Sequence, residues 1–529
     1  MLKLKLSFLG VLITSVVTAK EYHDPIKKKP DKKPNILVIL ADDLGYGDVQ
    51  CYNPGRGKIP TPNIDRLAAQ GIRFTDAHSS SAVCSPSRYT LLTGRYHWRT
   101  RLQAGIVGVF GEPLISTGRL TIAGLARQNG YRTACIGKWH LGWDWPIDPA
   151  LRPFLDVKNA GKNPDDEAPV ATSEYLAAWR DVFSKPIANG PITRGFDSYF
   201  GTDVPNWPPY CFFENDRTIG IPTEFLPREN FKNNLLASRL GPAVKDWKLE
   251  NILPTLGDRA SDFVKKAIKN PEPFLLYLAL TAPHTPLAVN EPWRGKSGLG
   301  TYADFVMETD AIVGRILDTL QKSGAAEHTL VIFTSDNGCT PIIGVAELEK
   351  KGHFPSGPFR GYKFDAWEGG HRIPFIVRWP GVAKPASICG QLVQQADLMA
   401  TIADILDTKL PDNAGEDSFS LLPLFKGKDK LIRENCINCS TKGVPAIRSG
   451  SWKLILAPGS GGWSMGDTDQ PIQLYNLADD PGETKNLAAG QPERVAKMKA
   501  LLEKLITDGR STPGEVQQND VKVRRFPGH

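Results

Sequence analysis

The sequence of 529 residues lacks the features of a membrane-spanning or nucleic-acid-binding chain. Beyond residue 20 it has no long apolar run, so we predict no later segment that spans a bilayer. Its formal charge of +7 is concentrated near the N-terminus: two lysines at positions 3 and 5 contribute two charges, the stretch 20–33 contributes three, and +2 remains. A nearly neutral body argues against nucleic-acid binding, because that affinity depends on many phosphate contacts.

The N-terminus has the layout of an export signal. Two lysines precede an apolar run over 6–17, and Val17-Thr18-Ala19 offers small residues for cleavage. The run is too short to span a bilayer comfortably, and no cysteine stands at the cleavage point, so neither a membrane anchor nor a lipoprotein is favoured. We expect a signal peptide over 1–19, a basic linker over 20–33, and a periplasmic or secreted protein without stable membrane insertion.

The eight cysteines do not form a recognisable zinc site. Cys436-Ile-Asn-Cys439 is a lone C-x-x-C pair, and zinc would need a second pair or histidines at matching spacing. A local disulfide and two free thiols both remain open at this point. Export permits disulfides elsewhere, but their connectivity cannot be read from the sequence.

Short apolar, β-branched runs alternate with helical patterns, which predicts an α/β fold with a mostly parallel central sheet. The expected strands are 35–41, 132–137, 274–280, 330–335 and 373–379, and the expected helices are 63–70, 118–128, 258–269 and 302–321. The stretch 144–257 is rich in Pro, Gly, Asn and Trp and has weak periodicity. We interpret it as an insertion over one face of the sheet.

From about residue 426 the pattern changes. "WKLILA" at 452–457 and "QLYNL" at 473–477 are typical of antiparallel strands, and 491–507 is an amphipathic helical stretch. We therefore expect a main domain over 34–425 and a smaller C-terminal α+β domain with an antiparallel sheet over 426–529.

Polar residues follow several of the expected strands. Asp42-Asp43, Lys138 with His140, His284, and Asp336-Asn337 each lie just beyond such a run. Taken singly, an Asp after a strand is usually a turn residue. Binding sites in open α/β sheets form beyond the carboxyl ends of the strands, so several such groups at one edge point to a site.

These side chains favour chemistry on an anionic ester. Three carboxylates and an amide oxygen form a hard, oxygen-rich set that suits calcium or magnesium better than zinc. Lys138 and Lys363 would add positive charge, and His140 and His284 could transfer protons. The expected reaction is hydrolysis of a phosphate or sulfate ester, with the element left open.

The stretch "AVCSPSRYTLLTGR" at 82–95 places a cysteine at the start of a predicted helix. Pro86 suits the first turn, and a helix N-terminus favours anions. A thiolate there would be an activated nucleophile. Thiolates nonetheless prefer soft metals, so Cys84 beside a hard cation is not explained by ordinary side-chain chemistry.

The sequence resembles the type I sulfatases over nearly its whole length. Cys84-Ser85-Pro86-Ser87-Arg88 followed by "LTGR" matches the motif in which that family converts cysteine to formylglycine. Further matching stretches occur in the family's order: "ADDLGYGD", "PNIDRLAAQGIRF", "GKWHLG", "APHTP", "SDNG", "GYKFDAWEGGHRIP" and "LYNLADDPGETKNLA". The pattern is most similar to the branch that contains arylsulfatase A and N-acetylgalactosamine-6-sulfatase.

The resemblance implies a fold, a cofactor and residue roles. It implies an alkaline-phosphatase-like α/β/α sandwich over 34–425 and a sulfatase that works through a formylglycine diol and a covalent sulfo-enzyme intermediate. One Ca²⁺, rather than Mg²⁺, would be held by the metal ligands Asp42, Asp43, Asp336, Asn337 and modified Cys84. Catalytic roles would fall to Cys84 as nucleophile, Arg88, Lys138, His140, His284 and Lys363. The Glu368–Gly370 turn and Arg372 would support Lys363, and His78, His97 and His353 would be surface or packing residues.

We expect a sulfated saccharide as substrate and a formylglycine-generating enzyme as partner, and no nucleic acid. Trp98, Trp143 and Trp207 are candidate sugar contacts, although large aromatic residues are more often packed. The favoured units are 6-O-sulfated galactose or N-acetylgalactosamine, with algal polysaccharides also open. The alternatives are a phosphonate monoester hydrolase or phosphodiesterase of the same superfamily and, more remotely, a non-catalytic glycan-binding protein. Oligomeric state stays undetermined.

Overall fold

The computed structural model describes residues 33–155, 170–231, 237–466 and 470–525. The predicted signal peptide and the linker up to residue 32 lie outside these residues. The chain from Pro34 onward forms one unit. Among the described helices, none is long and apolar enough to cross a membrane.

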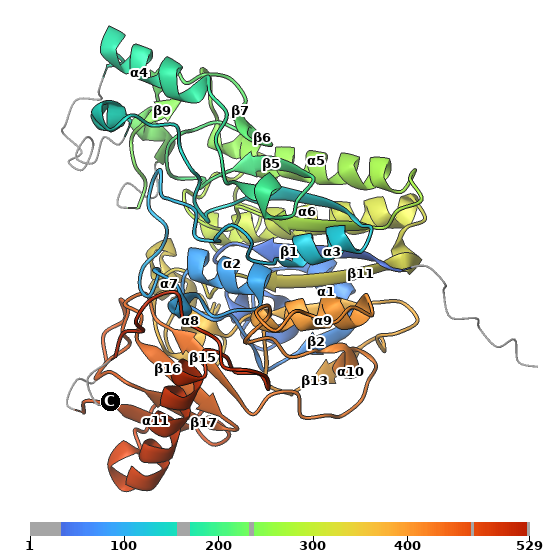
Figure 1. Ribbon diagram of the computed structural model, residues 1–529, viewed down its shortest axis with the longest axis vertical. Helices are drawn as coiled ribbons and strands as arrows, with labels where there is room; N and C mark the ends of the chain where they lie inside the picture. The colour runs from blue at the N-terminus through green and yellow to red at the C-terminus, as the bar shows by residue number, and fades with distance from the viewer. Residues whose placement is uncertain (1–32, 156–169, 232–236, 467–469, 526–529) are drawn as a thin grey trace, which may run out of the picture. The chain divides into compact units, whose positions relative to one another are not determined.

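A ten-stranded sheet forms the centre of this unit (Figure 1). In spatial order its strands are β13 (Ser387–Cys389), β2 (Ile72–Phe74), β12 (Phe375–Arg378), β11 (Thr329–Ser335), β1 (Asn35–Ala41), β10 (Phe274–Ala279), β4 (Arg132–Lys138), β5 (Ser198–Thr202), β6 (Phe213–Glu214) and β7 (Arg217–Thr218). The neighbours β11, β1, β10, β4 and β5 are parallel, so their carboxyl ends lie along one edge. β12 is antiparallel to both of its neighbours, β11 and β2. All five strands expected from the sequence are present.

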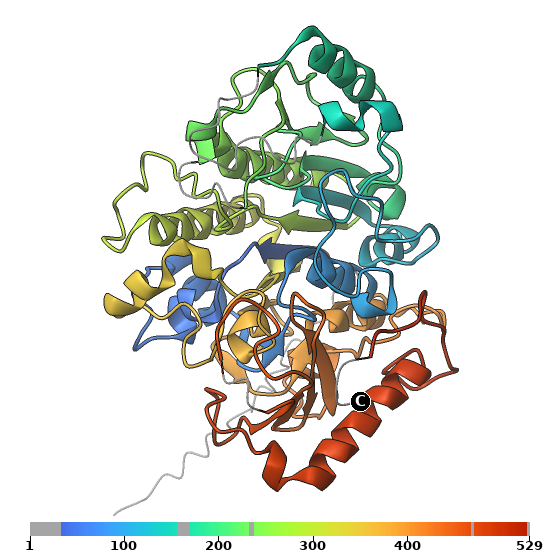
Figure 2. The same ribbon diagram turned by 90° about the vertical axis from the view of Figure 1, so that its left-hand side faces the viewer.

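Helices cover both faces of the sheet (Figures 1 and 2). One layer consists of α1 (Pro62–Ala69), α5 (Ile252–Ala267) and α6 (Thr301–Lys322), and the other of α2 (Cys84–Thr93), α3 (Ile122–Gln128) and α9 (Leu398–Ile405). Side chains of β1 alternate between the two cores: Leu37 and Ile39 join the first layer, and Val38 and Leu40 the second. Because both faces are covered, the strand is apolar throughout. The predicted α/β/α sandwich is confirmed.

The inserted stretch 144–257 does not simply lie over one face, so that expectation was wrong. Its strand β5 pairs in parallel with β4 and extends the sheet, and the β6–β7 hairpin continues it in antiparallel fashion. A strand of only five residues, "SYFGT", among Pro and Gly residues leaves little periodicity to detect. The insertion also supplies α4 (Ser173–Phe183) and the β8–β9 pair (Glu224–Phe225 and Pro242–Ala243).

The C-terminal segment forms an antiparallel sheet, as predicted. Its strands are β15 (Asn435–Cys439), β16 (Pro445–Ser449), β17 (Trp452–Ile455) and β18 (Gln473–Asn476), followed by α11 (Pro492–Thr507). The apolar side of this sheet and α11 enclose Tyr96 and Trp98 from the main α/β segment. The remaining elements are β3 (Ala77–His78), α7 (Val345–Lys350), α8 (Glu368–His371), β14 (Val393–Gln394), α10 (Leu422–Phe425) and short 3₁₀ turns.

The structure settles the open question about Cys436 and Cys439. Both lie on β15, where residues three apart point to opposite faces of a strand, so they cannot form a local disulfide. All eight cysteines lie in the described part of the chain, and all are free thiols there.

Candidate active site

The carboxyl ends of the central strands bring the predicted polar residues together. Ala41 of β1 is in register with Ser335 of β11, so Asp42 and Asp336 follow side by side. The Asp336 backbone N–H donates a 3.1 Å hydrogen bond to the Ala41 carbonyl, and the Asp42 N–H donates one of 3.0 Å to Ala282 in the loop after β10. Three segments far apart in the sequence therefore meet at one point.

Three buried carboxylates form the centre of the site. Asp42, Asp43 and Asp336 are fully buried. Asp336 accepts a 3.1 Å hydrogen bond from the Asp43 backbone, and the Asn337 side-chain amide donates one of 2.8 Å to Asp43. The other Asn337 side-chain atom, Oδ1, is buried and has no hydrogen-bond partner in the described part of the chain. Asp42, Asp43, Cys84 and His284 lie close enough to share one cation.

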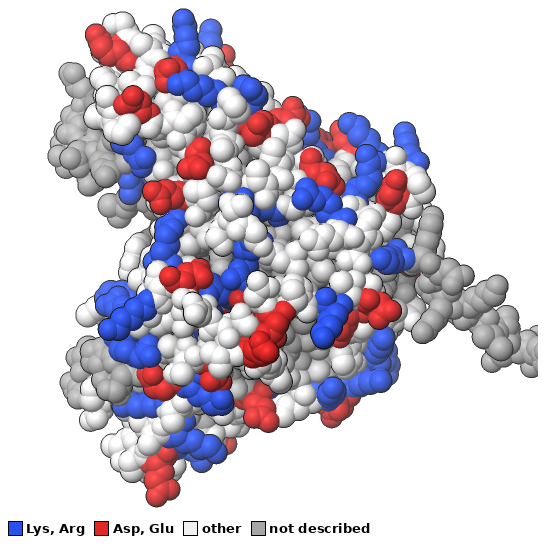
Figure 3. All heavy atoms as spheres, in the orientation of Figure 1, with Lys and Arg blue, Asp and Glu red and all other residues white. Residues whose placement is uncertain are grey.

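Three buried cations face these carboxylates. Lys138 Nζ lies 2.7 Å from Asp42 Oδ2, and Lys363 Nζ lies 2.7 Å from Asp43 Oδ2. Arg88 Nη2 lies 2.7 Å from Asp336 Oδ2. Being buried, these charges are separate from the surface, where basic and acidic side chains are interspersed on the face drawn in Figure 3. Their fixed positions make this a preorganised site for stabilising charge.

The charges perturb the carboxyl pKa values in opposite directions. Burial would raise the pKa of Asp42, but Lys138, with His284 and Arg88, holds it well below its usual value. Burial and the nearby charge of Asp42 raise the pKa of Asp336 to about 6. Burial opposes the charge of Lys363, yet Asp43 raises the Lys363 pKa above its usual value.

Cys84 is the first residue of α2, and its side chain points at the acidic cluster. Its Sγ atom lies 3.7 Å from Asp42 Oδ1. Burial raises the pKa of this thiol to about 12, although Lys138 and Lys363 act in the opposite direction. Desolvation outweighs the two lysines, so the unmodified thiol stays protonated at neutral pH.

His284 borders the cluster from the loop after β10. Its Nε2 atom lies 3.6 Å from Asp43 Oδ2, and Nδ1 lies 2.5 Å from the Thr285 carbonyl oxygen. Because a carbonyl only accepts, Nδ1 carries the proton of the neutral ring. Burial, together with Lys363, lowers the pKa of His284 to about 4, so the ring is neutral in this arrangement.

His140 lies two residues beyond Lys138 and has a left-handed backbone with φ 51°. Its Nε2 atom lies 3.1 Å from the Val107 carbonyl, which makes Nε2 the protonated nitrogen. Nδ1 is buried and unpartnered among the described residues. Burial and Lys138 hold the pKa of His140 well below its usual value, so the ring is neutral and Nδ1 is a free acceptor.

Asp203 is a site residue that the sequence reasoning missed. Its Oδ1 atom accepts hydrogen bonds from the His140 backbone N–H at 3.2 Å and from Trp143 Nε1 at 3.1 Å. Burial raises the pKa of Asp203 to about 6. It follows the carboxyl end of β5, as the other acids follow β1 and β11, and the signal was lost because β5 itself was not recognised.

The three candidate sugar-binding tryptophans have different surroundings. Trp98 is 5% exposed and packs with Tyr96 in the C-terminal core. Trp143 is 1% exposed and stacks on Phe213. Neither ring presents a free face to a sugar, and both serve as packing. Trp207 is only partly buried, and its ring meets that of His140 edge to face at 5.5 Å.

The turn formed by "EGGH" (α8, Glu368–His371) contacts two segments that lead to the acidic cluster. Gly370 accepts a 3.0 Å hydrogen bond from the Gly338 N–H, directly after Asn337, and the His371 carbonyl accepts one of 2.9 Å from Ser79. The turn thus supports both the β11 loop and the segment that leads to Cys84.

The histidines expected at the surface or in packing are all buried: His78, His97 and His353.

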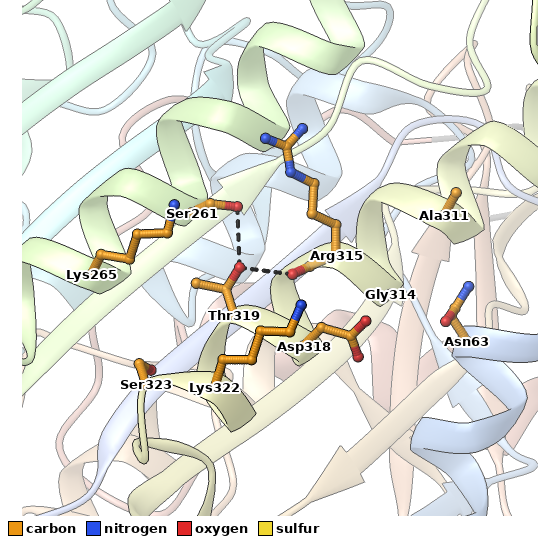
Figure 4. Close-up of a pocket in the computed structure, with 10 residues that line it drawn as sticks. All are labelled: Asn63, Ser261, Lys265, Ala311, Gly314, Arg315, Asp318, Thr319, Lys322 and Ser323. Carbon is orange, nitrogen blue, oxygen red and sulfur yellow. Dashed lines mark hydrogen bonds between the residues drawn. The ribbon is translucent and has the colours of Figure 1, made fainter.

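A separate groove lies between α5 and α6 (Figure 4). Tyr302, at the start of α6, donates a 3.3 Å hydrogen bond to the Asp43 carbonyl, whereas the groove follows the opposite half of α6 to Ser323. A helix rises 1.5 Å per residue, so the groove residues from Ala311 to Ser323 lie roughly 13 to 31 Å along the helix from Tyr302. Ser261 and Thr319 hydrogen-bond to each other in the groove (Figure 4). It is not part of the strand-end site.

A profile of the sulfatase family matches residues 34–408. The chain belongs to the sulfatase family. It is 35% identical to N-acetylgalactosamine-6-O-sulfatase of Bacteroides thetaiotaomicron, with 90% of this chain and 94% of the relative covered. It is 30% identical to human arylsulfatase A, with 94% of both chains covered. This sulfatase is therefore a sulfuric ester hydrolase, similar to the branch that the sequence motifs indicated.

Solved structures agree with this assignment. A structure associated with the metabolism of multiple glycosaminoglycans by Bacteroides thetaiotaomicron superimposes with a TM-score of 0.73 at 32% identity, covering 90% of this sulfatase and 99% of that chain. Ps i-CgsB in complex with k-i-k-neocarrahexaose gives a TM-score of 0.66 at 25% identity, covering 92% and 95%. The alkaline-phosphatase-like fold class is confirmed.

Proposed function

We propose that this sulfatase removes sulfate from a sulfated carbohydrate, with Cys84 acting after conversion to formylglycine. The observation that carries the proposal is the position of Cys84 Sγ, at the start of α2 and 3.7 Å from Asp42. The raised pKa of the thiol makes unmodified cysteine a poor nucleophile there. When present, hydrated formylglycine supplies a hydroxyl nucleophile in its place.

The acidic cluster fits a calcium ion. Asp42 and Asp43 lie close enough to Cys84 to share an ion with it, and an oxygen of modified Cys84 would complete the shell. Asp336 and Asn337 are the further proposed oxygen donors, and Asn337 Oδ1 has no hydrogen-bond partner among the described residues. Calcium suits this set better than magnesium because it tolerates a flexible cage of protein oxygens. A bound Ca²⁺ supplies positive charge beside the reacting group. The three carboxylates and three cations balance, so the divalent ion would leave a net positive site for an anionic ester.

The chain's own residues then bind, orient and exchange protons. Lys138 and Lys363 would hold the sulfate oxygens, and Arg88, fixed to Asp336 and to the Lys138 carbonyl, would orient residue 84. His284 and Lys363 would protonate the leaving alcohol. An anionic substrate beside His284 would raise its pKa from about 4 toward its usual range. His140, with Nε2 held by Val107, would accept a proton at Nδ1.

The proposed substrate is a 6-O-sulfated galactose or N-acetylgalactosamine unit. The 35% identity to an N-acetylgalactosamine-6-O-sulfatase over 90% of this chain supports it. The likeness to Ps i-CgsB in its neocarrahexaose complex keeps sulfated algal galactans in the panel to be tested. We further propose export to the periplasm or beyond, from the N-terminal signal pattern, and a formylglycine-generating enzyme as maturation partner.

Sulfate release from defined saccharides tests the proposal. The enzyme would be co-expressed with a formylglycine-generating system, and the mass of the peptide containing residue 84 would report its conversion. The panel contains 6-sulfated N-acetylgalactosamine and galactose, their positional isomers, glucosamine sulfates and algal oligosaccharides, with Cys84→Ala as control. Release confined to the 6-sulfated galacto sugars is expected.

Other outcomes have clear meanings. Release from another sugar alone would retain the sulfatase chemistry and replace the substrate. If no saccharide of the panel releases sulfate although residue 84 has been converted to formylglycine, the carbohydrate proposal is overturned. A strong preference for aryl phosphodiesters or phosphonates over aryl sulfates would favour the phosphonate monoester hydrolase or phosphodiesterase.

A further inference from the structure

The C-terminal sheet contacts the chain just after Lys363. One face of this sheet packs on α11, and the other face packs on Ala366 and Trp367. The Ala366 N–H donates a 2.7 Å hydrogen bond to the Ser460 carbonyl, in the loop that follows β17. That loop therefore lies beside the segment whose first residue, Lys363, faces the acidic cluster.

Asp365 holds this loop in place. Its buried carboxylate accepts 3.1 Å hydrogen bonds at Oδ1 from the backbone N–H groups of Trp463 and Ser464, and another at Oδ2 from the Ser464 hydroxyl. Gly462 packs so closely that a Cβ atom on it would lie 2.4 Å from the Phe364 carbonyl oxygen, so a larger residue would displace the loop. The backbone of Trp463 is thus fixed by the protein itself.

The rings of Trp463 and Phe364 are stacked. Their centres lie 3.8 Å apart, and the angle between their planes is 24°. Lys363 Nζ lies 5.4 Å from the centre of the same Phe364 ring and 2.7 Å from Asp43 Oδ2. The indole is therefore one ring away from the ammonium that is proposed to hold the sulfate. Phe364 has a left-handed backbone with φ 84°, which is costly for a bulky residue, and such strain clusters at functional sites.

The outward face of the Trp463 ring is open to solvent. The residue is 54% exposed even though Phe364 covers one face of its ring. Trp98 and Trp143, in contrast, are almost fully buried. An indole that is already held by a stack offers a flat apolar face to a ligand and loses little freedom when the ligand binds.

We propose that Trp463 stacks on the ring of the sugar that carries the scissile sulfate and thereby favours galacto-configured rings. This inference rests on the proposed carbohydrate sulfatase function. In a galacto-configured ring the axial C4 hydroxyl leaves the C–H groups of C3, C4 and C5 together on the opposite face, whereas a gluco-configured ring lacks this continuous apolar patch. Because C6 is bonded to C5, a ring that rests on the indole can extend its 6-O-sulfate to the neighbouring Lys363.

Inhibition constants test this contact. Three probes compete with an aryl sulfate substrate: 6-sulfated N-acetylgalactosamine, its gluco isomer, and inorganic sulfate, which has no sugar ring. Trp463→Ala should raise the inhibition constant of the galacto sugar by about tenfold, the loss of one apolar ring contact, and that of the gluco isomer by less. The constant for inorganic sulfate should stay at the wild-type value, because sulfate alone reaches only the buried cations. Trp463→Phe keeps a flat ring and should retain most of the affinity.

Trp452→Ala is the matched control. Trp452 is a partly buried tryptophan of the same sheet, but Arg494 Cζ lies 4.0 Å from its ring centre and it packs on the α11 side. Its variant should keep all three inhibition constants.

Unchanged constants in Trp463→Ala overturn the proposal. An equal rise for all three probes also overturns it, because that result indicates a displaced Lys363. Equal rises for the two sugars alone overturn the selectivity for galacto-configured rings. If the wild-type enzyme, with residue 84 converted, releases sulfate from no saccharide, the proposed function is refuted instead.

Discussion

Lys453 and Glu368 join the C-terminal sheet to the turn beneath the acidic cluster. The buried ammonium of Lys453, on β17, lies 3.0 Å from Glu368 Oε1 and 2.8 Å from Glu483. His78, Glu368 and His371 have the spacing of a metal site, but Lys453, also 3.2 Å from His371 Nε2, provides the cation there. Through α8 this ion pair supports the loop that carries Asp336 and Asn337.

Replacing Lys453 should destabilise the whole unit. Lys453→Met removes the cation that contacts buried Glu483 and one of three that contact Glu368, which keeps Arg372 and Arg448, and breaking a buried pair in this way costs about 3–5 kcal/mol. Urea unfolding of both proteins measures the difference. The control is Lys265→Met, which removes an exposed pair with Asp262 and should change the free energy of unfolding by less than about 1 kcal/mol. Equal effects of the two variants would contradict the role assigned to Lys453.

Removing the proposed nucleophile, Cys84, should abolish activity without unfolding the protein. Cys84→Ala deletes one sulfur atom at the start of α2, and we expect sulfate release from an aryl sulfate to fall by about 10³-fold or more. Circular dichroism and the thermal midpoint should stay near wild-type values. Activity within a few-fold of wild type would show that another group attacks sulfur.

Calcium should bind to and stabilise the folded protein. A ligand at 100 times its Kd adds about 2.7 kcal/mol to the free energy of unfolding, so Ca²⁺ should raise the thermal midpoint of the chelator-treated enzyme. Asn337→Leu removes the unpartnered Oδ1 donor and should reduce this shift. Chelation should also stop sulfate release, and Ca²⁺ should restore it. If Ca²⁺ does not change the thermal midpoint of the wild-type protein, the proposed calcium site is refuted.

Asp203 should act as a hydrogen-bond acceptor that positions His140. Both N–H groups that it binds meet the same oxygen, Oδ1, so Asp203→Asn can retain both contacts. Asp203→Ala loses them, and displacement of His140 should lower kcat by roughly 10–100-fold. Comparing kcat of the two variants separates hydrogen bonding from charge. If Asn is as damaging as Ala, the negative charge of Asp203 is what matters.

His97 should make stability depend on pH. Burial lowers its pKa from 6.5 to about 3, so the folded protein keeps His97 neutral while the unfolded chain binds a proton below pH 6.5. The free energy of unfolding should therefore fall as pH drops from about 6.5 toward 3, by up to about 1.4 kcal/mol per pH unit.

Urea unfolding as a function of pH measures this contribution. His97→Leu should reduce the slope in that window by the contribution of one histidine, while His140 and His284, whose pKa values are also lowered, keep theirs. His328→Gln, at an exposed position, should leave the slope unchanged. A slope that persists fully in His97→Leu would assign the effect to other groups.

Local pattern was sufficient for most of the fold but not for the insertion. The central strands are continuous apolar runs that hardly any other structure could accommodate, so β1, β10 and β11 were predicted nearly to the residue. β5 is five residues long, and its identity depends on pairing with β4. Asp203 was missed for the same reason: a residue that follows a strand becomes a site candidate only when the strand itself has been recognised.

The sequence by itself determined the chemical inventory: a cysteine in a motif that resembles the family's maturation motif, three acids, an amide and the basic residues at the strand ends. Tertiary structure decided the state and the surroundings of these groups. Burial holds the Cys84 thiol protonated, Lys453 provides the cation for a cluster with metal-like spacing, and Trp463 stacks on Phe364. Desolvation and ion pairing depend on which segments, distant in the sequence, pack together. No local sequence pattern encodes which segments these are.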